Sequence, residues 1–192
     1  MGGFLIKENN TGLTRPTIKF LRGITLSKIF ECYAYYESRY APESKLNKDD
    51  FDDIFSPVLN DTEVFFEKYE IGGFADFYEA YTAMTMFSKG EFNTKIKSLY
   101  KIYDIDESGE IDREELKIFL KSGILGLCRL LKISIPMDNE ISSFSYNCFK
   151  QMDVDRSGTI EYDEFETWIR NSDEIQDFLL MYTGQQTMDR AK

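Results

Sequence analysis

The chain has 192 residues, of which 42% are hydrophobic and 15% aromatic, and its formal net charge at pH 7 is −11. This apolar content excludes a disordered acidic polypeptide, because enough hydrophobic surface is present to form a core. The negative charge argues against nucleic acid and anionic lipid as ligands, and it favours cations and basic partners. No apolar stretch reaches the length of a transmembrane helix, so we expect no membrane-spanning segment.

The N-terminal segment differs from the rest of the chain in charge. The first 28 residues carry five basic side chains and one acidic side chain. Glycine, asparagine and proline in residues 1–16 favour irregular backbone, so residues 1–22 are predicted to form an irregular basic arm. Such an arm is either solvated, folded back on the acidic body, or in contact with an acidic partner.

Targeting and thiol signals are weak. Gly2 invites N-myristoylation, but the signal requires Ser or Thr where this chain has Ile6, so acylation is not expected. The three cysteines form no CxxC pair and the chain has no histidine, which argues against a zinc site or a redox motif. We therefore expect reduced, core-packed thiols and a cytoplasmic location.

From Thr25 onward, apolar residues recur every three or four positions in successive segments, which predicts a series of amphipathic helices. The first apolar residues of these segments are Ile29, Phe51, Val64, Phe77, Phe92, Leu116, Phe144, Phe165 and Ile175. The helix that begins near Leu116 is predicted to extend through Leu131 and to be followed by a partly packed loop. Helix, loop and helix alternate along the chain.

Two of the intervening segments, residues 104–115 (loop 3) and 153–164 (loop 4), carry the ligand pattern of the EF-hand calcium loop. Oxygen-bearing residues occupy the first, third, fifth, seventh, ninth and twelfth positions, and glycine occupies the sixth. The predicted ligands in loop 3 are Asp104, Asp106, Ser108, Glu110, Asp112 and Glu115. The predicted ligands in loop 4 are Asp153, Asp155, Ser157, Thr159, Glu161 and Glu164. The chain is therefore predicted to bind Ca²⁺ at two sites, with the seventh residue using its backbone carbonyl and the twelfth both carboxylate oxygens.

Two further loops align with the pattern in eroded form. Residues 39–50 (loop 1) align if Leu46 takes the eighth position, and residues 68–79 (loop 2) align if Glu79 takes the twelfth. Arg39 and Lys68 then stand first, where a cation repels calcium. We expect neither loop to bind calcium as an isolated site, although loop 2 could bind weakly if ligands come from elsewhere.

The predicted fold is all-α, with four helix-loop-helix units arranged as two EF-hand pairs and short β-ladders between paired loops. The apolar eighth residues Ile111 and Ile160 support such a ladder between loops 3 and 4. After the arm, residues 23–90 are predicted to form the pair with degenerate loops, 91–172 the pair with two calcium loops, and 173–192 a C-terminal helix and tail.

The sequence resembles the neuronal calcium sensor, calcineurin B and calcium-and-integrin-binding group of EF-hand proteins. Residues 87–90, the helix 95–103 and loop 3 resemble the group's third hand, and residues 165–170 and 175–180 resemble its last hand and closing helix. The first aspartates of loops 3 and 4 lie 49 residues apart, as in this group. The layout also resembles that of calaxin-like ciliary proteins, while two competent loops are closer to the calcium-and-integrin-binding branch.

Two functional hypotheses follow. In the first, calcium binding exposes an apolar groove on the C-terminal pair, which then takes an amphipathic helix of a protein target. The candidate groove residues, which could equally be core, are Ile96, Tyr100, Phe119, Leu120, Phe149, Trp168 and Ile169. In the second, the protein is a constitutive, light-chain-like subunit of a cytoskeletal or ciliary (axonemal) assembly whose shape calcium fixes or tunes. A pure calcium buffer is less favoured, and no catalytic motif stands apart from the calcium ligands, so an enzyme is not expected.

Overall fold

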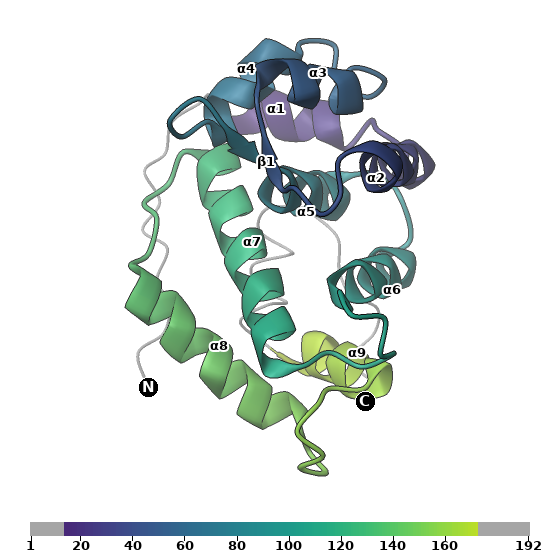
Figure 1. Ribbon diagram of the computed structural model, residues 1–192, viewed down its shortest axis with the longest axis vertical. Coiled ribbons are helices and arrows are strands. Elements are labelled where there is room, and N and C mark those ends of the chain that lie inside the picture. The colour runs from purple at the N-terminus through teal and green to yellow at the C-terminus, as the bar shows by residue number, and fades with distance from the viewer. Residues whose placement is uncertain (1–13, 173–192) are drawn as a thin grey trace. The chain divides into compact units, whose positions relative to one another are not determined.

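The computed structural model describes residues 14–172, and the elements in this range are almost all helical (Figure 1). The helices are α1 Thr14–Leu21, α2 Leu26–Arg39, α3 Lys48–Phe55, α4 Thr62–Tyr69, α5 Phe77–Phe87, α6 Phe92–Tyr103, α7 Arg113–Leu131, α8 Asp138–Met152 and α9 Tyr162–Asn171. The strands are β1 Lys45–Leu46 and β2 Ala75–Asp76. The all-α prediction is confirmed. The predicted C-terminal helix and tail at 173–192 lie outside the described residues.

The described chain divides into two compact units. The first unit contains residues 14–89 and 122–136, and the second contains residues 90–121 and 137–172. Along the chain, the first unit reaches Lys89 and the second begins at Gly90. The segment 122–136, which includes the second half of α7, packs within the first unit.

In the first unit, α2 and α3 form one hand and α4 and α5 the other. Their loops pair through β1 and β2 in antiparallel register, with Leu46 opposite Ala75. This is the pairing of eighth positions that the alignment of loops 1 and 2 predicted. Asparagine and aspartate side chains cap the N-termini of α3 and α5. Asn47 accepts a hydrogen bond from the Asp50 amide at 3.0 Å, and Asp76 accepts one from the Glu79 amide at 3.2 Å.

Aromatic rings fill the core of the first unit. The rings of Tyr36 on α2 and Phe77 on α5 stack with centroids 3.6 Å apart and an interplanar angle of 5°. The ring of Phe55 on α3 also stacks with that of Phe77, and their centroids are 5.8 Å apart. Tyr36, Phe55 and Phe77 are all almost completely buried, so these three helices are held by one hydrophobic cluster.

Helix α1 replaces part of the predicted irregular arm. Residues 1–13 lie outside the described range, but residues 14–21 are helical. Pro16 stands in the first turn, where a missing amide costs no intrahelical hydrogen bond. Leu21 is completely buried and the ring of Phe20 lies 6.0 Å from that of Phe65, and this burial stabilises a helix that the local composition disfavours.

Helix α7 runs without a break from loop 3 to Leu131, as the apolar spacing predicted (Figure 1). Its second half approaches α5 closely at two glycines. A Cβ atom at Gly123 would lie 3.9 Å from the methyl group of Thr82, which is ordinary contact. A Cβ atom at Gly126 would lie 2.1 Å from the carbonyl oxygen of Glu79, which is impossible without movement of the backbone. The two glycines therefore lie on the face of α7 that packs against α5.

The cysteines have a packing role. Cys32, Cys128 and Cys148 are buried and free. Burial raises the pKa of Cys32 to about 12 and that of Cys128 to about 11, so both are protonated and unreactive near neutral pH. No helix within residues 14–172 has the combination of length and apolar character needed to cross a membrane.

We predict opposite effects for alanine at the two glycines of α7. Gly126→Ala should destabilise the protein by about 1–3 kcal/mol, because the added methyl group collides with the Glu79 carbonyl. Gly123→Ala should stabilise it by up to about 1 kcal/mol, through higher helix propensity at a site with room. Urea denaturation measures both, and equal stability of the two variants would contradict the close approach at Gly126.

Candidate metal sites

Loops 3 and 4 lie between helices of the second unit and meet at their eighth residues. Ile111 and Ile160 form an antiparallel bridge, in which each amide donates to the other's carbonyl oxygen, at 3.0 Å and 2.8 Å. Both side chains are buried. The ladder predicted from the apolar eighth positions is therefore present, and it holds the two loops back to back.

Loop 3 gathers three carboxylates at its centre. Oxygen atoms of Asp104, Asp106 and Glu115 all lie within 4.8 Å of one another. Asp104 ends α6, Asp106 follows two residues later, and Glu115 lies in the first turn of α7 with 7% of its surface exposed. The fold thus brings the carboxylates of the first, third and twelfth residues of loop 3 together.

Backbone amides orient these carboxylates. Glu115 accepts hydrogen bonds from the amides of Ile105 at 2.7 Å and Asp112 at 2.9 Å, one on each oxygen. Asp104 accepts a bond from the amide of Gly109 at 2.9 Å across the turn. Gly109 has φ +90°, a left-handed conformation that side chains resist, which explains glycine at the sixth position.

The remaining predicted ligands of loop 3 adjoin this group. The Ser108 hydroxyl lies 2.9 Å from the carbonyl oxygen of Glu110 and 3.4 Å from Asp104. The Glu110 side chain accepts a hydrogen bond from Thr159, so its carbonyl is the group near the loop centre. Asp112 uses one carboxylate oxygen to cap α7, accepting from the Glu115 amide at 2.8 Å. One oxygen of Asp112 remains for an ion or a bridging water, as expected at a ninth position.

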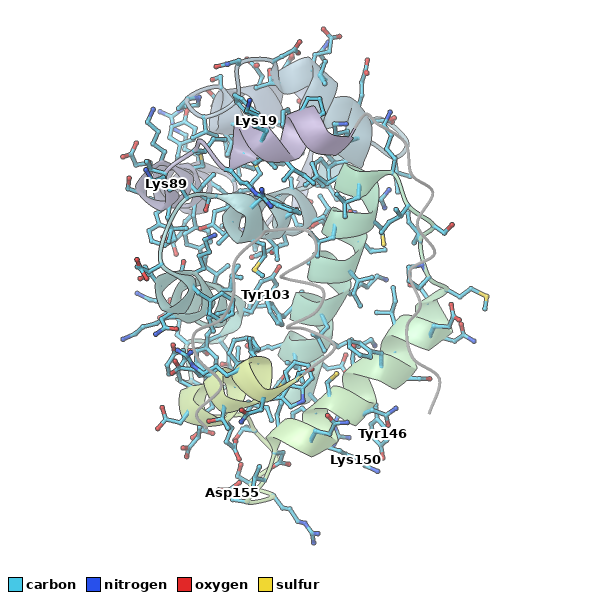
Figure 2. The ribbon with its side chains drawn as sticks, turned by 180° about the vertical axis from the view of Figure 1, so that it is seen from behind. Lys19, Lys89, Tyr103, Tyr146, Lys150 and Asp155 are labelled. Atoms are coloured by element: carbon cyan, nitrogen blue, oxygen red, sulfur yellow. The ribbon has the colours of Figure 1, made fainter. Side chains whose placement is uncertain are left out.

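Loop 4 repeats the arrangement at the turn between α8 and α9, where Figure 2 marks Asp155. Oxygen atoms of Asp153, Asp155 and Glu164 lie within 4.8 Å of one another. Glu164 accepts a hydrogen bond from the Val154 amide at 2.9 Å and another from the Glu161 amide at 3.2 Å. Three predicted ligands remain: the Ser157 hydroxyl lies 3.1 Å from the carbonyl oxygen of Thr159, and Glu161 is the N-cap residue of α9.

One atom of loop 4 indicates the charge of the ligand. Oδ1 of Asp153 is buried and has no hydrogen-bond partner within the described part of the chain. A buried anionic oxygen without a partner is costly, and a cation removes that cost. The hard oxygen donors of both loops suit Ca²⁺ in kind and number, so the residues fit this ion.

Tyr100 joins the two loops in a way that the sequence did not reveal. Its hydroxyl donates to the carbonyl oxygen of Ile160 at 2.7 Å and lies 3.1 Å from that of Gly109. Burial raises the pKa of Tyr100 to about 12, so the hydroxyl keeps its proton. The sequence placed Tyr100 among groove residues by its apolar spacing, but a partner 60 positions away cannot be inferred from local spacing.

Most of the other predicted groove residues also belong to the core. Ile96, Leu120, Phe149 and Ile169 are at most 6% exposed. Phe119 and Trp168 are half-buried, and the Trp168 indole donates to Gln151 at 3.0 Å. In the described conformation the apolar face of this unit is therefore largely covered by its own helices.

The degenerate loops lack such clusters. Within residues 14–172, neither loop 1 nor loop 2 brings three carboxylates together. The Arg39 guanidinium lies over the ring of Tyr35, 5.0 Å from its centroid. In loop 2 the turn amide of Gly73 is bound by Glu70, because Lys68 replaces the aspartate that binds the equivalent amide in loop 3.

The chain is similar in sequence to known calcium-binding proteins of the EF-hand class. Residues 93–170 match the family model of an EF-hand domain pair. Guanylyl cyclase-activating protein 1 of Gallus gallus is 26% identical over 159 residues, which are 78% of this chain and 77% of that protein. Calcineurin B of Candida glabrata is 30% identical over 112 residues, 58% of this chain and 59% of that protein. Calaxin of Danio rerio is 30% identical over 94 residues, 49% of this chain and 43% of that protein.

We predict that Tyr100→Phe weakens the junction of loops 3 and 4. The carbonyl oxygens of Gly109 and Ile160 lose a donor, so the free energy of unfolding should fall by about 1–2 kcal/mol. Tyr146→Phe is the matched control, because Tyr146 is exposed on α8 (Figure 2) and its change should stay within about 0.5 kcal/mol. Chemical denaturation compares the two, and equal stability would show that the Tyr100 hydroxyl is dispensable.

Proposed function

Because the chain is an EF-hand protein resembling the neuronal calcium sensor, calcineurin B and calcium-and-integrin-binding group, we propose that it is a regulatory protein that binds Ca²⁺ in loops 3 and 4 and engages a protein target. The observation that supports this proposal most directly is the pair of three-carboxylate clusters in loops 3 and 4, which are joined through Ile111 and Ile160. Bound calcium would supply the positive charge that the clustered carboxylates lack. The buried, unpartnered Oδ1 of Asp153 supports this assignment independently.

The proposed ligands are the twelve residues predicted from the sequence. Asp104, Asp106 and Glu115 in loop 3, and Asp153, Asp155 and Glu164 in loop 4, supply the central carboxylates. Ser108, Glu110 and Asp112, and likewise Ser157, Thr159 and Glu161, complete the two shells, with Glu110 and Thr159 using their carbonyl oxygens. We assign no catalytic role to the protein.

Target engagement is proposed to use apolar helix surfaces of the second unit. Several large apolar side chains of this unit are exposed, including Ile118 on α7 at 39% and Tyr146 on α8 at 45%. The buried candidates Ile96 and Phe149 become available only if calcium changes the packing of these helices, as in EF-hand sensors. The proposed occupant is an amphipathic helix of a cytoplasmic protein.

A constitutive subunit of a cytoskeletal or ciliary assembly is the second candidate. Its support is the first unit, whose loops hold no acidic cluster within the described residues and so give that unit no evident calcium dependence. Exposed basic residues near the N-terminus, Lys19, Arg22 and Lys28, would suit an acidic partner surface. The similarity to calaxin, over 49% of this chain, agrees with this second candidate.

We predict that Glu115→Gln and Glu164→Gln each weaken calcium binding at their own loop by at least about tenfold, because a bidentate charged ligand becomes neutral. Glu114→Gln and Asp163→Asn are matched controls, since each removes one neighbouring charge outside the ligand set and should change affinity little. Calorimetric titration should find two strong sites in the wild-type protein. Trp168, the single tryptophan and four residues beyond Glu164, provides a fluorescence signal for loop 4.

The titration has two outcomes that contradict the assignment. More than two strong sites, or none, would be inconsistent with loops 3 and 4 as the calcium sites. Equal effects of Glu115→Gln and Glu114→Gln would show that Glu115 is not a ligand.

The two functional candidates differ in their dependence on calcium. Affinity capture with the full chain is compared in calcium, in chelator, and with the Glu115→Gln/Glu164→Gln variant. The regulatory proposal expects partners that are retained in calcium and lost in the other two conditions. Partners retained equally in all three would contradict the regulatory proposal and support the constitutive subunit.

A further inference from the structure

The twelfth residue of loop 2 has a different partner from its counterparts in loops 3 and 4. The register of Ala75 opposite Leu46 fixes Glu79 as that twelfth residue, four positions beyond the paired eighth. In loop 3 the equivalent Glu115 turns its carboxylate into the loop and accepts from loop amides. The carboxylate of Glu79 is instead bound by the guanidinium of Arg129, from the last turn of α7.

This ion pair is buried. Nε of Arg129 lies 2.5 Å from Oε2 of Glu79, and the two side chains are 12% and 9% exposed. Burial raises the pKa of Glu79 in spite of the favourable charge of Arg129, so the low-dielectric surroundings oppose an unaccompanied carboxylate. The carboxylate therefore depends on a cation, and that cation is part of the chain.

The helix backbone places Arg129 at this point. Gly126, one turn earlier on the same face of α7, allows the helix to touch the backbone of Glu79 itself. Gly123, one turn earlier again, faces Thr82, which is one turn beyond Glu79 on α5. Two helices packed at this separation hold the guanidinium against the carboxylate with little freedom to leave.

The first two positions of loop 2 offer no carboxylate to an external ion. Lys68 stands at the first position, and burial together with the charge of Lys132 lowers its pKa. The hydroxyl of Tyr69, at the second position, is completely buried, has no hydrogen-bond partner within the described residues, and lies where the charges of both Glu79 and Arg129 act on it. Loop 2 thus carries a lysine at the first position, where a calcium loop carries an aspartate, and keeps Glu70 at the third.

We propose that Arg129 is the resident cation of the second hand, bound to the twelfth-position carboxylate of loop 2 in place of calcium. The hand formed by α4 and α5 is then set permanently by the chain's own charge. Calcium responses are confined to loops 3 and 4, and α7 is anchored to the first unit through Arg129 whether or not calcium is present. This inference concerns loop 2 alone and does not depend on the calcium sites proposed above.

The first test is a double-mutant cycle followed by thermal denaturation in calcium and in chelator. Arg129→Met leaves Glu79 buried without a cation and should lower Tm by roughly 6–20 °C in both conditions. Arg129→Lys, which keeps the charge but not the planar group, should lose less. The Arg129→Met/Glu79→Gln variant should recover part of the loss, because neither charge remains buried alone. If Arg129→Met fails to fold, Arg129→Lys takes its place in the cycle with Glu79→Gln, so that both single variants are still measured.

The matched control is Lys121→Met on the same helix. Lys121 pairs with Asp138 at 2.9 Å, but the side chains are 43% and 83% exposed, so the change in Tm should stay within about 2–4 °C. A loss for Arg129→Met no larger than that for Lys121→Met, or strictly additive effects in the cycle, would overturn the proposal.

The second test asks whether Glu79 binds calcium. Glu79→Gln should bind calcium with the same stoichiometry and the same affinities as the wild-type protein in calorimetric titration. Loss of one binding event in Glu79→Gln would make Glu79 a calcium ligand and overturn the proposal. Failure of Glu115→Gln to weaken binding would instead count against the function proposed for loops 3 and 4, so the two failures are distinguishable.

Discussion

Two backbone hydrogen bonds between Ile111 and Ile160 determine the positions of both acidic loops. Each of these residues stands between the carbonyl of the seventh position and the carboxylate of the ninth, so fixing the bridge fixes the ligands on either side. The Tyr100 hydroxyl also donates to the carbonyl oxygen of Ile160 and reinforces the junction. Because the two loops share this backbone contact, calcium bound in one loop would act on the other through it.

The bridge brings negative charges together, and this creates an electrostatic cost. Three carboxylates in each loop lie within 4.8 Å of one another, a distance at which like charges repel strongly. Amides of Ile105, Gly109 and Asp112 offset part of the repulsion in loop 3. They carry only partial charges, and in loop 4 the amides leave Oδ1 of Asp153 without a donor within the described residues. The chain thus prearranges the oxygens, and a divalent cation bound among them would complete the charge balance.

Local pattern was sufficient to predict the loops. A ligand at every second position and a glycine at the turn are constraints within twelve residues, and the structure places Gly109 and Gly158 at φ +90° and +93° as such turns require. The register of loops 1 and 2 was also predictable, because Leu46 and Ala75 stand at equivalent positions. The extent of α7 to Leu131 followed from its apolar spacing.

Features that depend on tertiary contact could not be predicted. Helix α1 forms because Leu21 is buried, although the composition around it favours irregular backbone. Arg129 and Glu79 are 50 positions apart, and nothing near either residue indicates the other.

The two ends of α7 show two ways of balancing the charge of a twelfth-position carboxylate. Glu115 in its first turn is a twelfth-position carboxylate that the structure leaves available to an external ion, whereas Arg129 in its last turn satisfies the twelfth-position carboxylate of another hand. An external ion can leave when its concentration falls, but a guanidinium attached to the backbone cannot. If loop 3 binds calcium as proposed, one helix carries a reversible charge balance at one end and a permanent one at the other. A protein built in this way can keep the second hand fixed while loops 3 and 4 respond to calcium, so a lasting attachment and a calcium response need not exclude each other in one chain.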